Sequence, residues 1–357
     1  MSRKIRQIVL MLLVAMLFTL FSGCAGKHEL PEKSGKLPTE SLSNDTESLK
    51  TDTDKLQPPK EKTDINIAAL KGPTSLGMLK MMEDAKAGKT ANNYHFTVAG
   101  AADEITAGIL KGDYPLAAIP CNLASVLYNK SDGGITMLGI NTLGVLYIVE
   151  TGDTIKSVTD LKGRRIYSTG KGTTPEYTLN QLLMAAGLDP ERDVTVTFCA
   201  EATEVASILS ETENAVAMLP QPFVTTVLMN NERARIALDV TEEWERLSPG
   251  TTIVTGVVVA NTKFLNGNRA AVLEFLSEYA DSAEFAVNEP EKAAALSEKF
   301  GIFKEAVAKR AMPYCNIVFL EGAEMKEKAG AYLQVLFEQN PAAVGGKLPE
   351  DNFFFER

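Results

Sequence analysis

The chain has 357 residues, with 36 Lys and Arg against 46 Asp and Glu, so its formal net charge is −10. This acidic balance leaves no basic footprint and argues against nucleic-acid binding. An apolar fraction of 45% is ample for a packed core, and the length suggests about two compact units. Four Cys and two His are too few for a disulfide framework or a multi-His metal site.

The first 23 residues have the pattern of an export signal. A basic start at Arg3, Lys4 and Arg6 precedes an apolar run over 8–21, which is too short to span a membrane comfortably. The run ends in Ser22-Gly23-Cys24, which resembles a bacterial lipobox. The resemblance implies cleavage before Cys24 and a diacylglyceryl group on its thiol. An ordinary signal peptide with an incidental Cys, or an uncleaved anchor, is the alternative.

Residues 24–63 are expected to form a flexible tether between the lipidated Cys and the folded part. From 25 to 63 there is no Val, Ile, Met or aromatic residue, while Lys, Glu, Asp, Ser, Thr and Pro are abundant. Such a segment buries too little apolar surface to offset its ordering entropy. Because Leu42, Leu49 and Leu56 recur at a heptad interval, an amphipathic segment is the alternative.

From Asp64 onwards, apolar strands alternate with helical patterns. The first unit has predicted strands at 65–70, 94–98 and 116–119, and helices at 76–87, 102–111 and 123–129. Two further apolar strands follow at 136–140 and 144–150. This order predicts an α/β fold with a mostly parallel sheet covered by helices.

The alternation then restarts and predicts a second α/β unit. Strands at 165–168, 194–198 and 215–219 enclose helices at 175–186 and 201–210. A β-branched strand at 252–260 precedes a helical C-terminal region, with helices at 268–287, 290–300, 304–312 and 322–339. Because this region has no sheet of its own, we expect it to pack on the first lobe.

Two loops repeat a pattern at equivalent places. Lys71-Gly72-Pro73-Thr74-Ser75 and Lys171-Gly172-Thr173-Thr174-Pro175 each join the first strand of a unit to its first helix. A small-residue loop before a helix leaves backbone N–H groups pointing outward at the positive end of the helix dipole. Two such ends that face each other would bind an anion, although chance can also produce the repeat.

The chain resembles the solute-binding proteins of ABC transporters, which have the type II periplasmic-binding fold. The resemblance is narrower to the nitrate/sulfonate/taurine and thiamine-precursor group, which includes SsuA/TauA-like and NMT1/THI5-like proteins. It covers nearly all of residues 64–345. The segments that carry it are the lipobox, Ile65-Asn66-Ile67-Ala68 before the Pro73-Thr74-Ser75 loop, Ser157-Val158-Thr159-Asp160-Leu161-Lys162-Gly163, and Met218-Leu219-Pro220-Gln221-Pro222-Phe223.

The resemblance implies two lobes that close on a solute and present it to a membrane permease and its ATPase. Lobe 1 would comprise 64–153 with 252–357 and lobe 2 would comprise 154–251, with hinges near 150–155 and 249–256. The protein would be a monomer at the extracytoplasmic face of the bacterial membrane, anchored at Cys24. A ligand-binding sensor or co-receptor lipoprotein that is not coupled to transport is the alternative.

Ten polar or aromatic residues at the ends of strands or the starts of helices are candidates for ligand binding. Each also has a structural alternative, which is helix capping, a turn or half-buried packing. Asn141 directly precedes one of the candidates, Thr142, and both lie between two apolar strands. The candidates are Thr74, Ser75, Asn122, Thr142, Thr173, Thr174, Glu176, Tyr177, Gln221 and Phe223.

Several conspicuous residues are assigned elsewhere. Thr255-Gly256 is expected at a hinge or a close backbone approach, and Trp244 is expected to hold a surface helix. His95 is expected to be a half-buried structural residue. Arg164 and Arg165 are expected to be solvated, and Cys121, Cys199 and Cys315 to be small buried hydrophobes.

No pattern for catalysis is present. The sequence has no Gly-x-Ser-x-Gly elbow, His-Glu-x-x-His helix or Walker loop, and nothing that resembles the Cys-rich iron-binding stretch of the relatives that make a thiamine pyrimidine. We therefore expect no enzyme activity, no metal site and no cofactor. The expected lining is neutral, without a clear Lys or Arg, and fits a small organic solute such as a sulfonate, a carboxylate or a pyrimidine-like compound.

Overall fold

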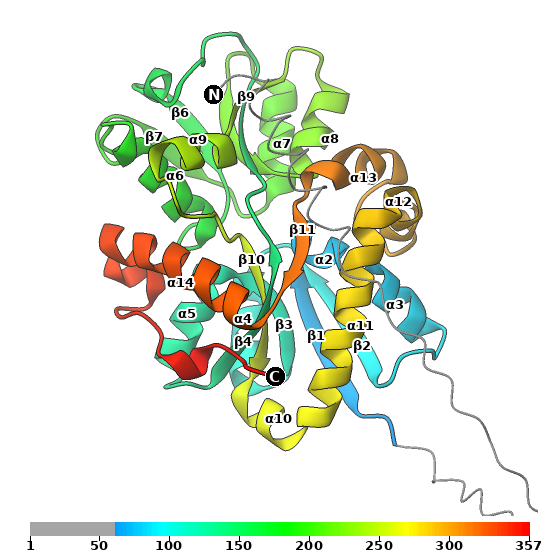
Figure 1. The fold of residues 1–357 in the computed structure, drawn as a ribbon. Helices are drawn as coiled ribbons and strands as arrows, with labels where there is room; N and C mark the ends of the chain where they lie inside the picture. Colours follow the sequence, from blue (N-terminus) through cyan, green and yellow to red (C-terminus); the bar gives the residue numbers. More distant parts are fainter. Residues whose placement is uncertain (1–60) are drawn as a thin grey trace, which may run out of the picture. The chain divides into compact units, whose positions relative to one another are not determined.

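The computed structural model describes residues 61–357 (Figure 1). The predicted signal peptide, the lipidation site Cys24 and the tether up to residue 60 lie outside the described residues. In the part of the chain that the structure describes, no helix has both the length and the hydropathy needed to cross a membrane. The described residues all belong to one compact unit, which contains two sheets.

The first sheet has six strands in the order β11-β4-β10-β3-β1-β2. Strand β1 pairs in parallel with both β2 and β3, whereas β10 runs antiparallel to its neighbours β3 and β4. In β10, Val257 and Val259 enter one apolar cluster while Val258 and Ala260 enter another, so the sheet is buried on both faces. The strands are β1 (Asp64–Leu70), β2 (Asn93–Ala99), β3 (Leu116–Pro120), β4 (Ile135–Thr142), β10 (Gly256–Asn261) and β11 (Ile317–Leu320).

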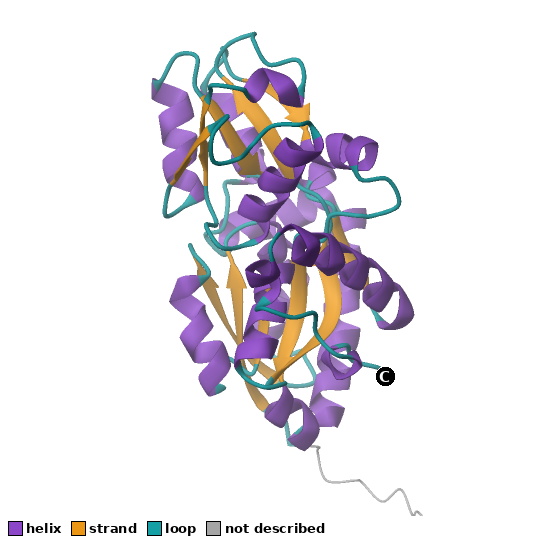
Figure 2. Cartoon of the chain, turned by 90° about the vertical axis from the view of Figure 1, so that its left-hand side faces the viewer, coloured by secondary structure: helices purple, strands orange, loops and turns teal. Residues whose placement is uncertain are grey.

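Helices cover both faces of this sheet, as Figure 2 shows. We call this sheet with its helices the first lobe. Its helices are α2 (Pro73–Leu76), α3 (Leu79–Lys86), α4 (Asp103–Lys111), α5 (Cys121–Lys130), α10 (Thr262–Gly267), α11 (Arg269–Asn288), α12 (Pro290–Lys299), α13 (Glu305–Ala311) and α14 (Gly322–Gln339). Short 3-10 turns lie at η2 (Met312–Tyr314), η3 (Pro341–Val344) and η4 (Asp351–Phe353).

The second sheet has five strands in the order β7-β6-β8-β5-β9. Strand β6 pairs in parallel with β7 and β8, and β5 is antiparallel to β8 and β9. The strands are β5 (Leu146–Glu150), β6 (Arg165–Ser168), β7 (Thr195–Phe198), β8 (Val216–Pro220) and β9 (Arg235–Asp239). With η1 (Val158–Leu161), α6 (Thr174–Ala185), α7 (Ala202–Glu211), α8 (Phe223–Asn230) and α9 (Val240–Leu247), they form the second lobe.

The predicted α/β fold with two sheets is confirmed, but the first change of sheet comes earlier than expected. Strand β5 already pairs with β8 and β9 of the second sheet, so the chain crosses at 143–145 and not at 150–155. Both β4 and β5 are fully buried apolar strands, so their composition does not reveal which sheet each one joins. The return crossover, at 248–255, agrees with the second predicted hinge.

Other differences concern single elements. The predicted helix 76–87 is two helices, α2 and α3, which are interrupted at Gly77, where an added Cβ would lie 3.3 Å from the Tyr279 hydroxyl oxygen. The predicted strand 252–260 begins only at Gly256, because Ile253 and Val254 are buried in the crossover. Strands β9 and β11 and helix α8 were not predicted.

The C-terminal region packs on the first lobe as predicted, but it contacts the second lobe as well. Helix α11 packs on α3, and β11 adds a strand to the first sheet. Helix α14 also contacts α6, where the Thr178 and Tyr332 hydroxyl oxygens lie 2.8 Å apart. The ring centroids of Tyr332 and Trp244 are 5.6 Å apart. An apolar cluster therefore runs from one lobe into the other on this side.

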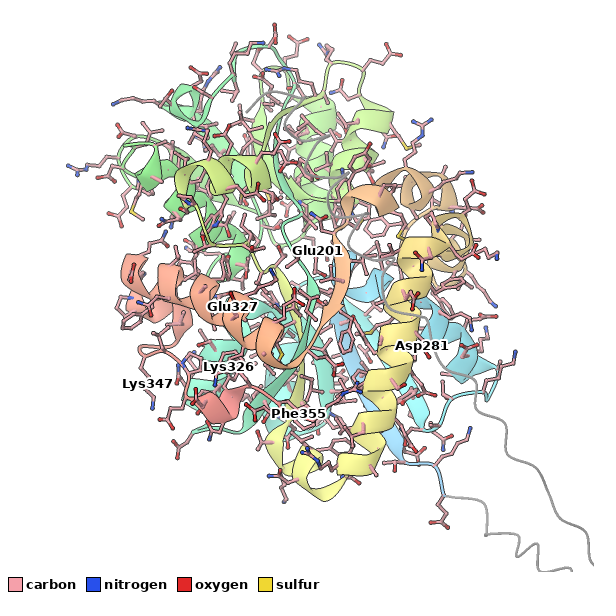
Figure 3. All side chains as sticks on the ribbon, in the orientation of Figure 1. Glu201, Asp281, Lys326, Glu327, Lys347 and Phe355 are labelled. Carbon is pink, nitrogen blue, oxygen red and sulfur yellow. The ribbon has the colours of Figure 1, made fainter. Side chains whose placement is uncertain are left out.

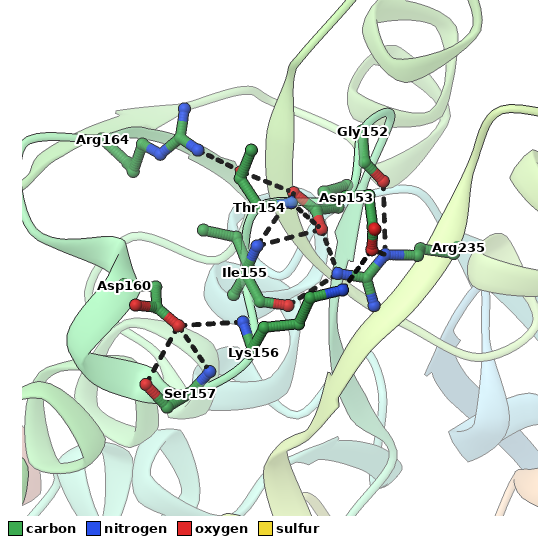
Figure 4. A network of polar contacts seen from close by, with 10 residues as sticks. Gly152, Asp153, Thr154, Ile155, Lys156, Ser157, Asp160, Arg164 and Arg235 are labelled. Carbon is green, nitrogen blue, oxygen red and sulfur yellow. Dashed lines mark hydrogen bonds and ion pairs between the residues drawn. The ribbon is translucent and has the colours of Figure 1, made fainter.

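A buried carboxylate holds the loop that follows β5. Glu150 is only 1% exposed, accepts hydrogen bonds from the backbone N–H groups of Thr154 and Ile155, and pairs with Arg235 of β9. Figure 4 shows Arg235 beside this loop, where its guanidinium also bonds the carbonyls of Gly152 and Ile155. Burial by itself raises the pKa of Glu150, but these N–H groups and the guanidinium outweigh burial, and the pKa lies below its usual value. The residues predicted as a hinge are thus tied to the second lobe.

Candidate ligand-binding cleft

A cavity of about 720 Å³ lies between the two sheets. Its lining comes from six strand-to-helix junctions, three in each lobe, and from both crossovers. The junctions are β1–α2, β2–α4, β3–α5, β6–α6, β7–α7 and β8–α8. All six lie at the carboxyl ends of the parallel strands, where open α/β sheets bind ligands and where helix dipoles present their positive ends.

The two repeated loops line this cavity together. Lys71 to Thr74 come from the first lobe and Lys171 to Pro175 from the second. A hydrogen bond links the two sides, because Nδ2 of Asn122 in α5 donates to the Gly172 carbonyl over 3.3 Å. The two loops therefore line one cavity from different lobes, and the binding of an anion between them stays a prediction.

The cavity is charged, contrary to the expected neutral lining. Lys71, Lys130 and Lys171 line it, and none of them forms an ion pair with a carboxylate among residues 61–357. Three acidic residues, Asp103, Glu104 and Glu201, also line it. Lys71 and Lys171 belong to the repeated loops, so the repeat itself was the signal that could have revealed them.

Thr255 lines the cavity, and its buried hydroxyl has no hydrogen-bond partner among the described residues. Its backbone is fixed, since its N–H donates to the Thr142 carbonyl over 3.0 Å and its carbonyl accepts from the Cys121 N–H over 3.2 Å. Its Oγ1 is buried and has no hydrogen-bond partner in the described part of the chain. A buried polar group without a partner is costly, so a ligand atom bound here would remove that cost. The sequence had assigned this residue to the hinge.

Four of the ten predicted site residues line the cavity. Thr74 and Thr173 have their hydroxyls turned to the backbone, with Oγ1 donating to the carbonyls of Leu70 and Gly170. They can therefore act as hydrogen-bond acceptors. The buried Thr174 and Phe223 line the cavity from the starts of α6 and α8. Their contact with a ligand stays a prediction.

The other six predicted residues do not line the cavity, and each takes part in a hydrogen bond within the protein. Ser75, Glu176 and Gln221 cap their own helices, where they bond the N–H groups of Gly72, Gly172 and Thr225. Thr142 donates to Asn141, and the carbonyl of Tyr177 accepts from Gln339. Asn122 is fully buried and bonds both lobes, because its Nδ2 donates to the Ala343 carbonyl of the first lobe over 3.0 Å and its Oδ1 accepts from Thr174 of the second over 3.2 Å.

A second contact between the lobes occurs at the β2–α4 junction. Glu201, just before α7, lies where the two lobes meet (Figure 3). A Cβ added to Gly100 would lie 2.9 Å from the Cδ and Oε1 atoms of Glu201, so the carboxylate approaches the glycine backbone closely. The glycine is needed here for space, not for its φ angle.

A similar close approach occurs at the second crossover. A Cβ added to Gly256 would lie 2.5 Å from Oδ1 of Asn141 and 2.7 Å from Cγ2 of Thr74. The close backbone approach expected there is therefore present, and it positions Thr74 beside the start of β10.

The remaining singled-out residues lie away from the cavity, with one exception. Trp244 is 1% exposed and holds α9, as predicted, while Arg164 and Arg165 donate to threonine hydroxyls. His95 lies on the edge strand β2 with its side chain 64% exposed, so the half-buried position expected for it is wrong.

Cys199 is the exception. It is half-buried and lines the cavity, whereas Cys121 and Cys315 are fully buried. Burial raises the pKa of the Cys199 thiol, and Glu204 raises it further. Residues 61–357 contain no group of three or more His, Cys, Asp or Glu side chains placed to hold a metal ion.

Two α/β lobes joined by two crossovers, with a ligand-sized cavity between their carboxyl edges, define the type II periplasmic-binding fold. The NMT1/THI5 like family model matches residues 135–293, which confirms the resemblance inferred from the sequence. A search of curated protein sequences gives no match.

Solved structures share the fold over most of the described residues. An ABC transporter structure from Parabacteroides distasonis is 24% identical, with a TM-score of 0.69 over 83% of this chain and 100% of that one. The alkanesulfonate-binding protein SsuA from Xanthomonas axonopodis pv. citri, bound to MOPS, is 15% identical, with a TM-score of 0.65 over 82% and 97%. The nitrate-binding protein NrtA from Synechocystis PCC 6803 is 11% identical, with a TM-score of 0.54 over 67% and 66%.

Proposed function

We propose that the protein is the extracytoplasmic solute-binding component of an ABC importer. It captures a small organic solute between its lobes and delivers it to a membrane permease. The observation that carries this proposal is the cleft itself, a cavity of about 720 Å³ that is built from the carboxyl ends of both sheets and lined by residues of both lobes. The structural neighbours described as an ABC transporter and as an alkanesulfonate-binding protein support it.

The closed state of the two lobes is the state that a permease would recognise. Because the cavity takes its lining from both lobes, only a closed state lets one solute satisfy both sets of groups. The chain crosses between the sheets twice, at 143–145 and 248–255, and these two segments would act as the hinge. The protein binds its solute without converting it and acts as a monomer.

The solute is a small organic anion, such as a sulfonate or a carboxylate. Lys71, Lys130 and Lys171 line the cavity without carboxylate partners, and Lys71 and Lys171 come from the two repeated loops that line it together. Phe223 is the one aromatic residue among the lining residues of 61–357, which disfavours a heterocycle stacked between rings.

Export and anchoring belong to the same proposal. The basic start, the apolar run over 8–21 and Cys24 support lipidation, which would place the folded part at the extracytoplasmic membrane face. The variant Cys24→Ser should then move from the membrane fraction to the soluble fraction after export. Retention of this variant on the membrane would contradict the lipid anchor but leave the binding function untouched.

Thermal unfolding with a panel of solutes tests the binding function. The panel comprises alkyl sulfonates, taurine, nitrate, aromatic carboxylates and pyrimidine precursors of thiamine. A solute at a hundredfold excess over its Kd should stabilise the protein by about 2.7 kcal/mol, which is easily measured. If no organic anion stabilises a cooperatively folded sample, the proposed solute class is wrong.

A matched pair of variants tests the role of the cleft lysines. Lys171→Ala should weaken the binding of an anionic hit by roughly tenfold. Lys162→Ala is the control, because Lys162 lies on the same lobe, pairs with Asp193 at 3.1 Å and does not line the cavity.

Stimulation of the permease ATPase by the solute-loaded protein distinguishes the import function from the alternative, a sensor function without transport.

A further inference from the structure

A second cavity, of about 540 Å³, adjoins the cleft. It lies between α7 and α8 of the second lobe and the α12–α13 connection of the first. Lys71 and Phe223 line both cavities. These two side chains therefore form the boundary between the cavities.

Phe303, in the α12–α13 connection, supports that boundary from the side of the second cavity. The ring of Phe223 packs edge-on against the ring of Phe303, with centroids 5.1 Å apart. Nζ of Lys71 lies 5.8 Å from the centroid of the same Phe303 ring. We call Lys71, Phe223 and Phe303 the partition. Because Phe223 belongs to the second lobe and the other two to the first, the partition forms when the lobes meet.

The second cavity is polar on the side of the second lobe. Hydroxyl and amide side chains of α7 and α8 line it, and those of Ser207 and Asn230 have no hydrogen-bond partner among the described residues. On the other side, Lys304 is paired with Glu298 at 3.2 Å. The cavity could therefore hold a polar chain end.

We propose that the partition sets the maximum length of the bound solute. With Phe303 in place, the solute is confined to the cleft and a long chain meets the edge-on ring pair. Without the Phe303 ring, Phe223 loses its support and the two cavities join, so a longer chain can extend towards the hydroxyls of α7 and α8. This inference rests on the proposed function, because it assumes that an organic anion binds in the cleft.

The test is the chain-length dependence of binding in Phe303→Ala, measured by calorimetry on the full protein with sulfonates that carry a terminal hydroxyl on chains of increasing length. Each additional buried methylene group strengthens binding by roughly fourfold. We expect the optimum to move to longer chains, so that the ratio of long-chain to short-chain affinity rises roughly tenfold or more over the wild type. Using this ratio cancels any uniform loss caused by weaker contact between the lobes.

Two further variants make the result specific. Phe300→Ala is the control, since Phe300 lies in the same connection, is half-buried and lines neither cavity. The double variant Phe303→Ala with Ser207→Trp should fill the second cavity and return the optimum to the wild-type length. If Phe303→Ala destabilises the fold, Phe303→Leu shortens the same side chain and should move the optimum in the same direction.

The outcomes separate the two proposals. An unchanged length preference in Phe303→Ala, or a shift as large in Phe300→Ala, would overturn the role of the partition while leaving anion binding intact. A wild-type protein that binds none of the sulfonates overturns the sulfonate class and, with it, this inference.

Discussion

Replacing Thr255 by Val should change the stability of the free protein and its affinity for solute in opposite directions. In the free protein, the buried Oγ1 of Thr255 has no described partner, while the backbone of this residue is held by Thr142 and Cys121. Val has nearly the same shape and no polar atom. Removing an unsatisfied buried hydroxyl should therefore stabilise the free protein by about 1 kcal/mol, or a Tm shift of about 2 °C for a chain of this size.

The same substitution should weaken solute binding. If the hydroxyl bonds the solute, its loss should cost about 1 kcal/mol of binding free energy, which is about a fivefold higher Kd. Urea unfolding gives the first quantity and titration calorimetry the second. The two effects have opposite signs, which a general loss of structure cannot produce.

Thr251→Val is the matched control in the same crossover. Its Oγ1 accepts a hydrogen bond from Nε1 of Trp244 and donates to the Ser248 carbonyl, each over 2.9 Å. Removing a satisfied hydroxyl leaves these partners unpaired, so this variant should lose about 1–2 kcal/mol of stability. The reasoning is wrong if Thr255→Val destabilises the free protein as Thr251→Val does, or if it leaves the Kd unchanged.

Three further predictions concern other contacts. Glu150→Gln should destabilise the protein by about 3 kcal/mol at neutral pH, because it leaves Arg235 without its buried partner. The pKa of Glu150 lies below its ordinary value of 4.5, so the stability that Glu150 contributes is present above pH 4.5 and is lost as the pH falls through the lowered pKa. Urea unfolding from pH 7 to pH 3 should therefore show a smaller loss of stability in the variant than in the wild type. Gly100→Ala should weaken solute binding a few-fold in calorimetry, because its Cβ would clash with the Glu201 side chain and hold the two lobes apart. Adding Glu201→Ala should remove this clash and restore affinity; no restoration would exclude the clash as the cause. The thiol of Cys199 should react slowly with a maleimide at pH 7, because its pKa is raised. Since Cys199 lines the cavity, bound solute should slow this reaction further, and labelling that is unaffected by solute would place the solute elsewhere.

The order of strands and helices revealed the fold because periodicity is a local property. Sheet membership is not local. Strands β4 and β5 are both apolar and follow each other closely, and only their pairing with β10 on one side and with β8 and β9 on the other assigns them to different sheets. The crossover was therefore predicted too late in the chain.

The candidate site was only partly predictable, for a related reason. Ser, Glu, Asn and Gln at helix starts suit both ligand binding and capping, and Ser75, Glu176 and Gln221 bond their own backbone. Whether Lys130 lies in solvent or in a cleft depends on the opposing lobe, which no local pattern describes. For Thr255, the decisive property is the absence of a partner within reach, and that becomes visible only after packing.

The contacts between the lobes differ in character on the two sides of the cleft. Near α14 they are extensive and apolar, with Tyr332 packed on Trp244, whereas around the cavity they are isolated contacts, which are the polar bonds of Asn122 to the second lobe and the ring pair of Phe223 and Phe303. Single polar contacts contribute little each, so they hold the lobes together only weakly. A solute that adds a few bonds to both sides can then shift the population of closed protein substantially. The stability of the α14 side and the weakness of the cavity side together would let solute binding control closure without unfolding either lobe.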